Sequence, residues 1–598
     1  MKLDGEKLPG PSVLPQFLEK RGVVEVLICA VSSLAYLGTI SFGFVYDDKP
    51  AIVDDVALRS WQFLARYFLP QASTTVAPSG AFYRPITLLW LRLNYLAFGL
   101  NPAGWHFVMV ACHVLVTYLV FVLVEKLTDN RRIAALAALL FGLHPVHVEN
   151  VAWLSSVNDL LLSIFLIGSL LAFLNFRDRQ KSKLWLGASL LLFALALLSK
   201  ETAAVFPFLI FGFSVMFARP RTAEDSGRVW PALPALKEGL VSTPYFVLLV
   251  IYLAIRKLPP HNPAQSLAPL AWSTMLLTAP SILWFDLKHL LIPISSSEFY
   301  SIAYVTAPGF RDFLLPIIFL LAALGVAAYC ISRLPDRGLG IFALGLAILT
   351  TLPSLYLRAI APGNFVHDRF LYLPSVGIVI FAALVVERIF FLGTAPGPVP
   401  ANRSAARIKW GILATLCTAA FALTVHHELP WASNILLYQN AMKYAPQNPI
   451  LQVDLANELA NMGHYDRALP LYLSALQSDP RSWLANYNLG YAYYRTGRFS
   501  DAEDYLKRSI QIDDSDSDQY IYLAIAQMQQ GKLPQASQNA ELAIKKGPLS
   551  PGFHFVLAKI QEAQGNRERA IAEYNAEVSA HPENAAAKGE LQRLQLPH

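Results

Sequence analysis

Charged side chains are scarce in this chain of 598 residues. Asp, Glu, Lys and Arg make up 15% of the sequence, whereas hydrophobic residues make up 55% and the mean hydropathy is +0.41. Soluble domains carry about 25% charged residues, so the composition excludes an ordinary soluble protein. The shortage is uneven, because apolar runs fill residues 1–430 and polar residues dominate 440–598. The sequence therefore predicts one body in the membrane and one in water.

Cysteine is also rare, and its four positions all lie in apolar segments, at Cys29, Cys112, Cys330 and Cys417. Their placement excludes a disulfide framework and a CxxC metal site, so we interpret them as buried small hydrophobic residues. The net charge of +6 is modest and lies in loops. It therefore bears on membrane orientation and does not indicate nucleic-acid binding.

Apolar runs of a length that can cross a bilayer recur through the first 430 residues, since about 20 apolar residues cover about 30 Å of hydrocarbon. We expect eleven spans, near 22–42, 104–124, 133–151, 156–176, 184–199, 203–218, 241–256, 313–332, 339–357, 370–392 and 408–427. The first span lacks a small-residue cleavage site and is predicted to be a retained anchor. A further run, 272–293, contains Asp286, Lys288 and His289 and is predicted to lie in the outer interface or to form a re-entrant hairpin.

Basic residues mark which loops face the cytoplasm. They gather around 131–132, 177–183, 219–228, 333–337 and 403–409. With eleven spans and a run at 272–293 that does not cross, all these loops fall on one side. The N-terminus is then cytoplasmic. The polar C-terminal body lies on the other face, in a bacterial periplasm or a eukaryotic lumen.

A period of 34 residues runs through the polar body. Gly463, Gly497, Gly531 and Gly565 keep this step, and so do the small residues Ala468, Ala502, Ala536 and Ala570. A helix–turn–helix unit of this length resembles the tetratricopeptide repeat, in which small residues allow close helix packing and Gly makes the turn. We expect four clear units and a degenerate one that starts near Trp431.

The predicted fold class is therefore all-α: a polytopic bundle of about eleven membrane helices over 1–430, followed by an α-solenoid of repeats over 431–598. Solenoids of this kind present a concave groove to extended peptides or proteins. Tyr487, Asn488 and Tyr491 are candidates for lining it as an acceptor groove, and packing between helices is the alternative interpretation for these residues.

Polar residues from five segments of the membrane body fall on the same, non-cytoplasmic face under this topology. They are Asp47 and Asp48; Arg84; His144, His147, Glu149 and Asp159; Lys200 and Glu201; and His367, Asp368 and Arg369. Ionisable residues near membrane depth are costly and indicate function. Their convergence argues against a pure scaffold, and their place at a face argues against a transporter with a mid-membrane site.

These residue types suit transfer from an anionic lipid-linked donor. A carboxylate at Asp47 or Asp48 can take the proton of an acceptor hydroxyl, and Arg84, Lys200 and Arg369 can bind a lipid phosphate. His144 and His147 with Glu149 offer ligands for a divalent cation. Their spacing differs from HExxH, so hydrogen bonding is favoured over a metal, and the metal question stays open.

Several stretches occur in the order of a known family: FVYDD, YRPITLLWLRLNY, HPVHVENVAWLSSVNDLL, LSKET and DRFLYLPSVG. With the repeats, the chain resembles the transmembrane and tetratricopeptide O-mannosyltransferases, which are C-type glycosyltransferases. The resemblance implies that Asp47 and Asp48 are essential and assigns Glu149 and Asp159 to the catalytic site. It also carries over His144, His147, Lys200 and Glu201, while Asp368 stands where eukaryotic members usually have Glu.

The resemblance implies a polyprenyl-phosphate sugar as donor, with mannose inherited from the family, and Ser or Thr of a protein bound by the repeats as acceptor. Compact loops indicate a bacterial member. Two alternatives remain: the same fold acting on a lipid or glycan acceptor, and a non-enzymatic membrane anchor that displays a repeat scaffold.

Overall fold

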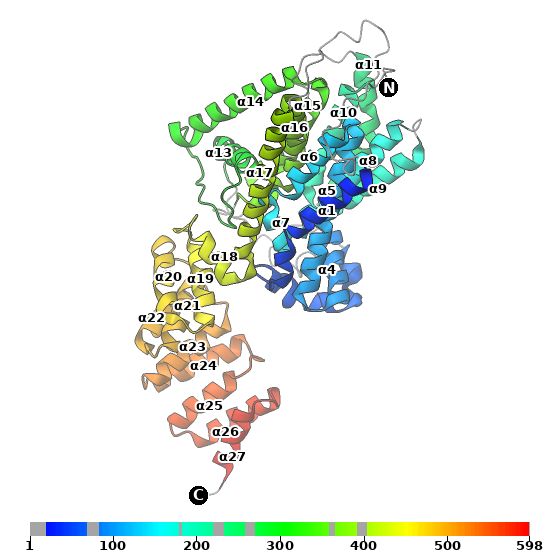
Figure 1. Ribbon diagram of the computed structural model, residues 1–598. Coiled ribbons are helices and arrows are strands. Elements are labelled where there is room, and N and C mark those ends of the chain that lie inside the picture. The colour runs from blue at the N-terminus through cyan, green and yellow to red at the C-terminus, as the bar shows by residue number, and fades with distance from the viewer. Residues whose placement is uncertain are drawn as a thin grey trace. The chain divides into compact units, whose positions relative to one another are not determined.

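The computed structural model describes residues 20–68, 83–178, 182–218, 233–256, 270–357, 365–390 and 403–596, and the regular elements of these residues are all helical (Figure 1). The chain divides into two compact units, residues 1–437 and 438–598. The predicted all-α class is confirmed. The predicted domain boundary after residue 430 falls within a short 3-10 turn, η17 (Leu429–Ala432), of the first unit.

The first unit contains long helices joined by short turns. The long helices are α1 (Arg21–Leu34), α4 (Pro85–Phe98), α5 (Pro102–Thr128), α6 (Arg131–Gly142), α8 (Val157–Asp178), α9 (Lys183–Ser199), α10 (Phe206–Met216), α12 (Thr243–Arg256), α13 (Trp272–Leu291), α14 (Leu315–Arg333), α15 (Arg337–Thr351), α16 (Tyr372–Phe390) and α17 (Arg403–Glu428). The short elements are η2 (Leu37–Ser41), η3 (Lys49–Val53), η4 (Val56–Arg59), η5 (Trp61–Phe63), α2 (Leu64–Tyr67), η7 (Pro145–His147), α7 (Val148–Ala152), η8 (Leu154–Ser156), η9 (Glu201–Val205), α11 (Leu233–Gly239), η11 (Leu240–Ser242), η13 (Phe310–Leu314), η14 (Leu352–Leu355) and η16 (Asp368–Leu371).

Seven of the described helical segments are long and apolar enough to cross a membrane. They are Pro102–Thr128, Leu154–Asp178, Leu236–Arg256, Phe310–Arg333, Arg337–Leu355, Asp368–Ile389 and Ile408–Ala432. Counting the pair Arg131–Gly142 and Pro145–Ala152, bent by 50°, as one broken span makes eight. Lys183–Ser199 and Glu201–Met216 are apolar but shorter. The expected number of eleven thus stays a prediction.

Two expected membrane elements differ from a simple span. The range 22–42 is divided between α1, which has 14 residues, and the 3-10 turn η2. At 1.5 Å per residue, 14 helical residues cover about 21 Å, which is less than the hydrocarbon core. The run 272–293 forms the 20-residue helix α13, which is not among the helices that are both long and apolar enough to cross a membrane. The predicted basic loop at 219–228 lies outside the described residues.

Polar caps set the ends of the central helices. Asn101 accepts a hydrogen bond from the backbone of Ala103 and precedes Pro102 at the first position of α5. The helix ends at Asp129, whose φ of +48° is left-handed, and Asn130 then caps α6. Asn at the N-cap and Pro at the first turn satisfy or remove backbone donors that have no helical partner. These caps allow two long helices to fold back on each other across a short turn.

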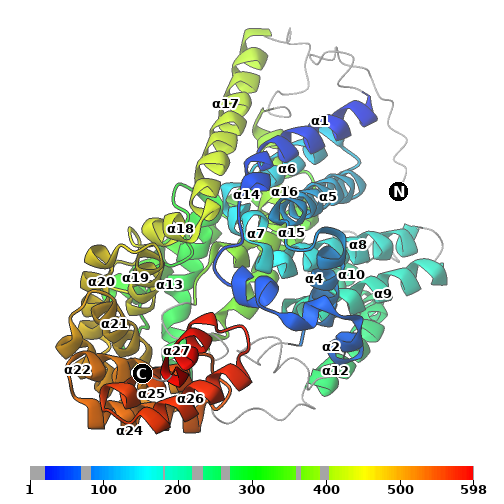
Figure 2. The same ribbon diagram turned by 90° about the horizontal axis from the view of Figure 1, so that it is seen from below.

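The core of the first unit lies where α5, α6, α8 and α16 pack together, and Figures 1 and 2 show α5, α6 and α16 side by side. It is aromatic, with Trp105, Phe121, Phe141 and Phe173 all at most 1% exposed. Between α15 and α16 the backbones approach closely at Gly377, where an added Cβ would lie 2.3 Å from the carbonyl oxygen of Ala343. Small residues permit such close packing between membrane helices.

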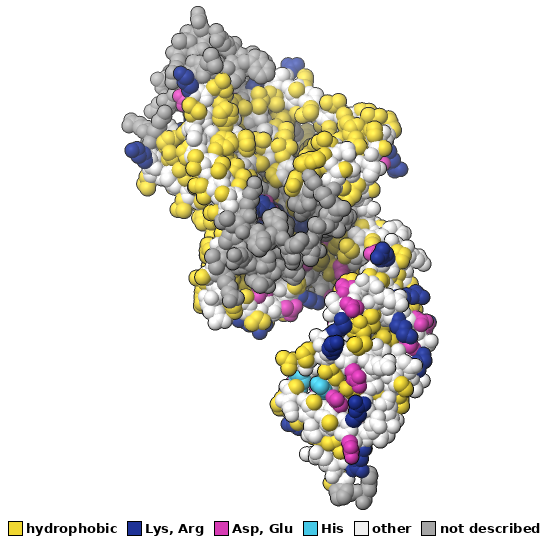
Figure 3. All heavy atoms as spheres, turned by 180° about the vertical axis from the view of Figure 1, so that it is seen from behind, with side chains coloured by type: hydrophobic (Ala, Val, Ile, Leu, Met, Phe, Trp, Pro, Cys, Tyr) yellow, Lys and Arg dark blue, Asp and Glu magenta, His cyan; other side chains and the backbone are white. Residues whose placement is uncertain are grey.

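Two of the apolar helices are largely uncovered. Only 6% of the apolar window is buried in Phe310–Arg333 and in Ile408–Ala432. Figure 3 shows hydrophobic side chains over much of the visible described surface of the first unit, whereas the second unit carries scattered charged side chains. An apolar surface of this extent is stable against lipid and is rare on soluble monomers. The first unit is therefore built as a membrane domain.

The second unit confirms the predicted repeats. Its helices are α19 (Pro449–Asn461), α20 (Tyr465–Ser478), α21 (Trp483–Arg495), α22 (Phe499–Ile512), α23 (Ser517–Gln529), α24 (Leu533–Lys546), α25 (Phe553–Ala563), α26 (Arg567–Ala580) and α27 (Ala585–Gln595), and α18 (Asn434–Ala441) precedes them. Ala468, Ala502, Ala536 and Ala570 are fully buried between the helices. Gly463, Gly497, Gly531 and Gly565 all have φ between +74° and +83°. The 34-residue period therefore repeats one buried contact and one left-handed turn.

The substitution Gly497→Ala tests the turn without adding a clash. No heavy atom lies within 4 Å of the added Cβ, so the φ of +76° is the only source of strain. Left-handed backbone costs a residue with a side chain about 1 kcal/mol or more. We expect the variant to lose about this amount of free energy of unfolding. Thermal unfolding of the full chain, followed through hydrogen exchange of the repeat helices, measures the loss.

Gly589→Ala is the matched control, because Gly589 lies within α27, has no left-handed φ and has open space around its Cβ position. Ala is the better helix former, so this variant should be neutral or more stable. Equal destabilisation by the two variants would contradict the role of the turn.

Candidate functional site

Asp48 anchors the first acidic loop to the membrane helices. Its side chain is fully buried and accepts hydrogen bonds from the backbone and hydroxyl of Ser155, at 2.9 and 2.7 Å, and from the backbone of Val45 at 3.2 Å. Burial raises the pKa of Asp48 to about 7, and the three donors keep it from rising further. A buried carboxylate that accepts three hydrogen bonds holds its loop in place and has little access to a substrate.

The neighbouring Asp47, in contrast, is exposed. The residue before it, Tyr46, has a φ of +52°, and its backbone amide donates to Asn434 Oδ1 at 2.7 Å. Left-handed backbone at a non-Gly residue is strained and must be held by its surroundings. The anchored turn therefore directs two adjacent carboxylates to opposite environments, and Asp47 is the one that a substrate can reach.

Asp47 also lies within the electrostatic influence of a cation. Surrounding protein raises the pKa of Asp47, and the nearby Arg369 guanidinium lowers it. The side chain thus touches solvent on one side and protein on the others. A carboxylate with this environment can act as a general base, because it is accessible and only partly stabilised by charge.

Arg369 joins this loop to a buried acidic cluster. Its guanidinium Nη1 contacts Glu149 Oε1 and lies 3.3 Å from Glu298 Oε1, and its backbone amide donates to Glu149 Oε2 at 2.9 Å. Both glutamates are 1% exposed. Burial and the charge of Glu149 raise the pKa of Glu298 well above its usual value, although Arg369 opposes this.

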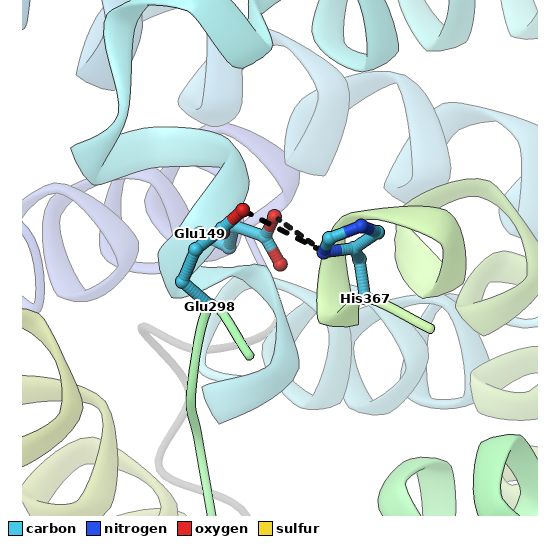
Figure 4. Close-up of side chains that lie close together, drawn as sticks. All are labelled: Glu149, Glu298 and His367. Carbon is cyan, nitrogen blue, oxygen red and sulfur yellow. Dashed lines mark ion pairs between the residues drawn. The ribbon is translucent and has the colours of Figure 1, made fainter. Parts of the chain in front are cut away.

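His367 completes the cluster from the other side. Its Nδ1 lies 3.9 Å from Glu149 Oε1 and 3.7 Å from Glu298 Oε1, and Figure 4 shows the ring facing both carboxylates. One ligand atom from each of these three buried residues lies within 4.8 Å of the others. Two carboxylates and one imidazole are a donor set that can hold a divalent metal ion.

A second charged cluster contains the remaining cations predicted for this face. Arg84 donates to both oxygens of Glu201, at 2.7 and 3.1 Å, and Lys200 Nζ lies 2.6 and 2.7 Å from the two oxygens of Asp159. Lys200 and Asp159 are 6% and 5% exposed. Each cation is therefore neutralised by a carboxylate of the protein itself.

The ring of Phe370 connects the two clusters. Lys200 Nζ lies 5.3 Å from its centroid and Arg369 Cζ lies 5.2 Å from it. Arg369 Cζ also lies 4.9 Å from the ring of Trp153. Cations within about 6 Å of an aromatic centroid are attracted to its face. The aromatic residues thus hold both cations in position without adding charge.

The histidines of the HPVHVE stretch make hydrogen bonds and are not among the three residues of the acidic cluster. A ring nitrogen of His144 lies 3.0 Å from the carbonyl oxygen of Leu290, and one of His147 lies 2.8 Å from Ser375 Oγ. Asp368 accepts a hydrogen bond from the Tyr300 hydroxyl at 2.9 Å. These hydrogen bonds hold the segments next to the site in place.

The structure thus brings most of the predicted residues into two adjacent clusters and adds one that sequence reasoning missed. Glu298 follows three serines in the segment between α13 and η13. An isolated acid in a loop carries no motif, and its position after the interfacial run was the only available signal. The catalytic and phosphate-binding roles predicted for these residues stay predictions.

In the second unit, the predicted groove residues lie together on α21 and are half-buried. The side-chain amide of Asn488 donates to Asn457 Oδ1 at 2.8 Å, and Arg495 donates to the Tyr491 hydroxyl at 2.8 Å. The rings of Tyr487 and Tyr491 lie 6.2 and 4.8 Å from that of Tyr522 on α23. They form an aromatic surface across two consecutive units.

Two family models match separate parts of the chain. Residues 84–241 match the family described as dolichyl-phosphate-mannose-protein mannosyltransferase. Residues 453–517 and 523–585 match the tetratricopeptide repeat. The first range includes Arg84, Glu149, Asp159, Lys200 and Glu201.

Curated relatives match most of the chain. Protein O-mannosyl-transferase TMTC3 of Mus musculus is 26% identical over 607 residues, which cover 94% of this chain and 61% of the relative. Protein O-mannosyl-transferase TMTC4 of Homo sapiens is 27% identical over 522 residues, covering 77% of this chain and 66% of the relative. Protein O-mannosyl-transferase Tmtc1 of Drosophila melanogaster is 37% identical over 179 residues, covering 29% and 20%. The chain spans 61% of the length of TMTC3.

The burial of Asp48 predicts a pH-dependent stability. Its pKa of about 7 in the folded chain exceeds the ordinary value of 3.8, so the folded state holds an additional proton between these values and stability falls as the pH rises toward 7. Asp48→Asn removes this dependence. From about pH 5.5 to about pH 7.5 the wild type should lose about 2 kcal/mol relative to the variant.

Thermal unfolding of both proteins in detergent at matched pH values measures this difference. Other titrating groups cancel, because they are common to the two chains. A difference that stays constant across this pH range would show that Asp48 is ionised throughout.

The mannosyltransferase match precedes the two tetratricopeptide matches along the chain, and the curated relatives span both regions. The chain is therefore similar, over most of its length, to the protein O-mannosyl-transferases of the TMTC type.

Proposed function

We propose that this protein is a glycosyltransferase that moves a sugar from a polyprenyl-phosphate donor to Ser or Thr of protein acceptors, with mannose as the sugar. The observation that carries the proposal is an accessible carboxylate, Asp47, within electrostatic range of the Arg369 cation, which itself binds a buried acidic cluster. The names of the relatives and the mannosyltransferase match support the reaction class.

The chemistry is a single displacement. Asp47 takes the proton of the acceptor hydroxyl as the hydroxyl oxygen attacks C1 of the sugar, and the bond from C1 to the phosphate oxygen breaks. The polyprenyl phosphate leaves with the bonding electrons, and the anomeric configuration inverts. Asp48 acts through the loop that it anchors, because its oxygens are occupied by Ser155 and Val45.

The leaving phosphate gains negative charge and needs a cation. Arg369 suits this role, because its side chain is 18% exposed while Nη1 remains bound to Glu149. A guanidinium can donate to phosphate oxygens from its other nitrogens. Arg84 is 19% exposed and Lys200 is 7% exposed, so Arg84 is the second candidate and Lys200 chiefly orients Asp159.

The proposed orientation follows from the basic loops. The N-terminus is cytoplasmic, and the clusters and the repeat domain lie on the periplasmic or lumenal side. The uncovered apolar helices supply the lipid contact that a polyprenyl donor needs. Tetratricopeptide repeats are protein-interaction modules, so the second unit recruits the acceptor.

Asp47→Asn tests the base. The variant keeps the size of the side chain but cannot take a proton, so transfer from a polyprenyl-phosphate-mannose donor should fall by about 10²- to 10⁴-fold. The assay uses the purified full chain, a panel of polyprenyl-phosphate sugars and a protein acceptor. Asp54→Asn is the matched control, an exposed carboxylate seven residues further along.

Wild-type activity retained by Asp47→Asn would refute the assignment of the base. If no donor is turned over while the folded protein still captures envelope proteins, the scaffold interpretation replaces the enzyme. Transfer to lipid or glycan with none to protein would support the alternative acceptor.

Tyr491→Ala tests acceptor recruitment. The variant removes the ring that contacts Tyr522 in the aromatic surface. KM for a protein acceptor should therefore rise about tenfold, which corresponds to a loss of about 1.4 kcal/mol of binding free energy. The value of kcat should not change. A short Ser/Thr peptide that cannot span the repeats should show no change. Tyr505→Ala on α22 is the control, and an equal rise in KM for both variants would contradict recruitment by α21.

A further inference from the structure

Three buried side chains from distant parts of the sequence converge on one point. Glu149 comes from α7, Glu298 from the segment after α13 and His367 from the residue before η16. Each is 1% exposed, and one ligand atom of each lies within 4.8 Å of the other two. In Figure 4 the two carboxylates and the imidazole face a common space.

The distances from His367 to the two carboxylates are longer than direct hydrogen bonds and leave room for a shared ion. His367 Nδ1 lies 3.7 and 3.9 Å from the two carboxylate oxygens. A hydrogen bond between such atoms is about 2.7–3.2 Å long. Two donors that each lie about 2.1 Å from one metal ion at the tetrahedral angle are separated by about 3.4 Å, so a bound ion would draw His367 Nδ1 and the carboxylate oxygens closer by about 0.3–0.5 Å.

The net charge of the cluster also favours a bound cation. Glu149 and Glu298 together carry two negative charges when ionised, and the Arg369 guanidinium that contacts both supplies one positive charge. The carboxyl of Asp368 also lies within electrostatic range of Glu149. Uncompensated charge in a buried site costs several kcal/mol. A bound proton or a bound divalent cation would balance it.

We infer that Glu149, Glu298 and His367 form a binding site for one divalent metal ion. This assignment rests on the geometry and charge of the cluster and not on the proposed reaction. Two carboxylate oxygens and one imidazole nitrogen suit Mn²⁺ or Zn²⁺, because imidazole favours transition metals over Mg²⁺ and Ca²⁺. Three protein ligands leave coordination positions for water or for an oxygen of a ligand.

The ion lies next to Arg369, so the two cations share the same carboxylates. Each carboxylate oxygen has two lone pairs and can accept from Arg369 while it binds a metal. The two positive charges nevertheless repel each other, and Arg369 therefore weakens metal binding. If the protein acts on a lipid phosphate as proposed, the ion and Arg369 together would bind that phosphate, and this role alone depends on the proposed function.

Metal titration of the full-length protein in detergent tests the site. The protein is stripped with EDTA and titrated with Mn²⁺, and free Mn²⁺ is followed by electron paramagnetic resonance, with Zn²⁺ as the competing ion. We expect saturable binding of one ion per chain. Glu298→Gln and His367→Asn should each lower the affinity at least tenfold, whereas Glu387→Gln, a buried glutamate of α16 that pairs with Arg132, should not.

Arg369→Gln distinguishes loss of a ligand from loss of the fold. The backbone amide of residue 369 still donates to Glu149 and holds the ligands together, while loss of the competing charge should make Mn²⁺ bind at least tenfold more tightly than in the wild type. A misfolded protein would not gain affinity. The inference is overturned if the wild type does not bind either ion at millimolar concentration, or if Glu298→Gln and His367→Asn leave binding unchanged. Binding without sugar transfer would refute the proposed function alone, and transfer in EDTA without binding would refute the metal site alone.

Discussion

The ion pair between Glu149 and Arg369 is the contact on which the site depends. The two residues are 220 positions apart, yet the guanidinium and the backbone amide of Arg369 both contact the carboxylate of Glu149. This double contact ties α7 to η16 and places Arg369 between Trp153, Phe370 and the Asp47 loop. A buried pair of this kind is expensive to break, because the partner that remains is an unpaired charge.

The structure shows which polar residues bind each other and which are accessible to a ligand. Arg84 and Lys200 are predicted phosphate ligands, but their first partners are Glu201 and Asp159. Asp48 is held by three hydrogen bonds, whereas the adjacent Asp47 is exposed. Rigid internal pairs of this kind hold the accessible groups in a fixed geometry, which is the requirement for a preorganised charged site.

Much of this organisation is readable from residue patterns, and the reasons for the remainder are physical. The 34-residue step predicts the repeats, since each unit must bury the same small residues. Apolar runs indicate the membrane helices, but their number depends on bends such as the 50° break at His144. Glu298 carries no local signal, because its importance comes from a fold that brings it to Glu149 and His367.

The sequence by itself determined the all-α class, the order of membrane domain and repeats, and the polar segments that carry the candidate site, because hydropathy, repeat period and polar motifs are local properties of the chain. Only the tertiary structure decided which of Asp47 and Asp48 is accessible, which carboxylate pairs with each cation, and that Glu298 joins His367 and Glu149. Pairing and burial depend on contacts between segments about 40 or more residues apart, as in the 41 positions between Asp159 and Lys200 and the 71 between Glu298 and Arg369, and no local pattern specifies them.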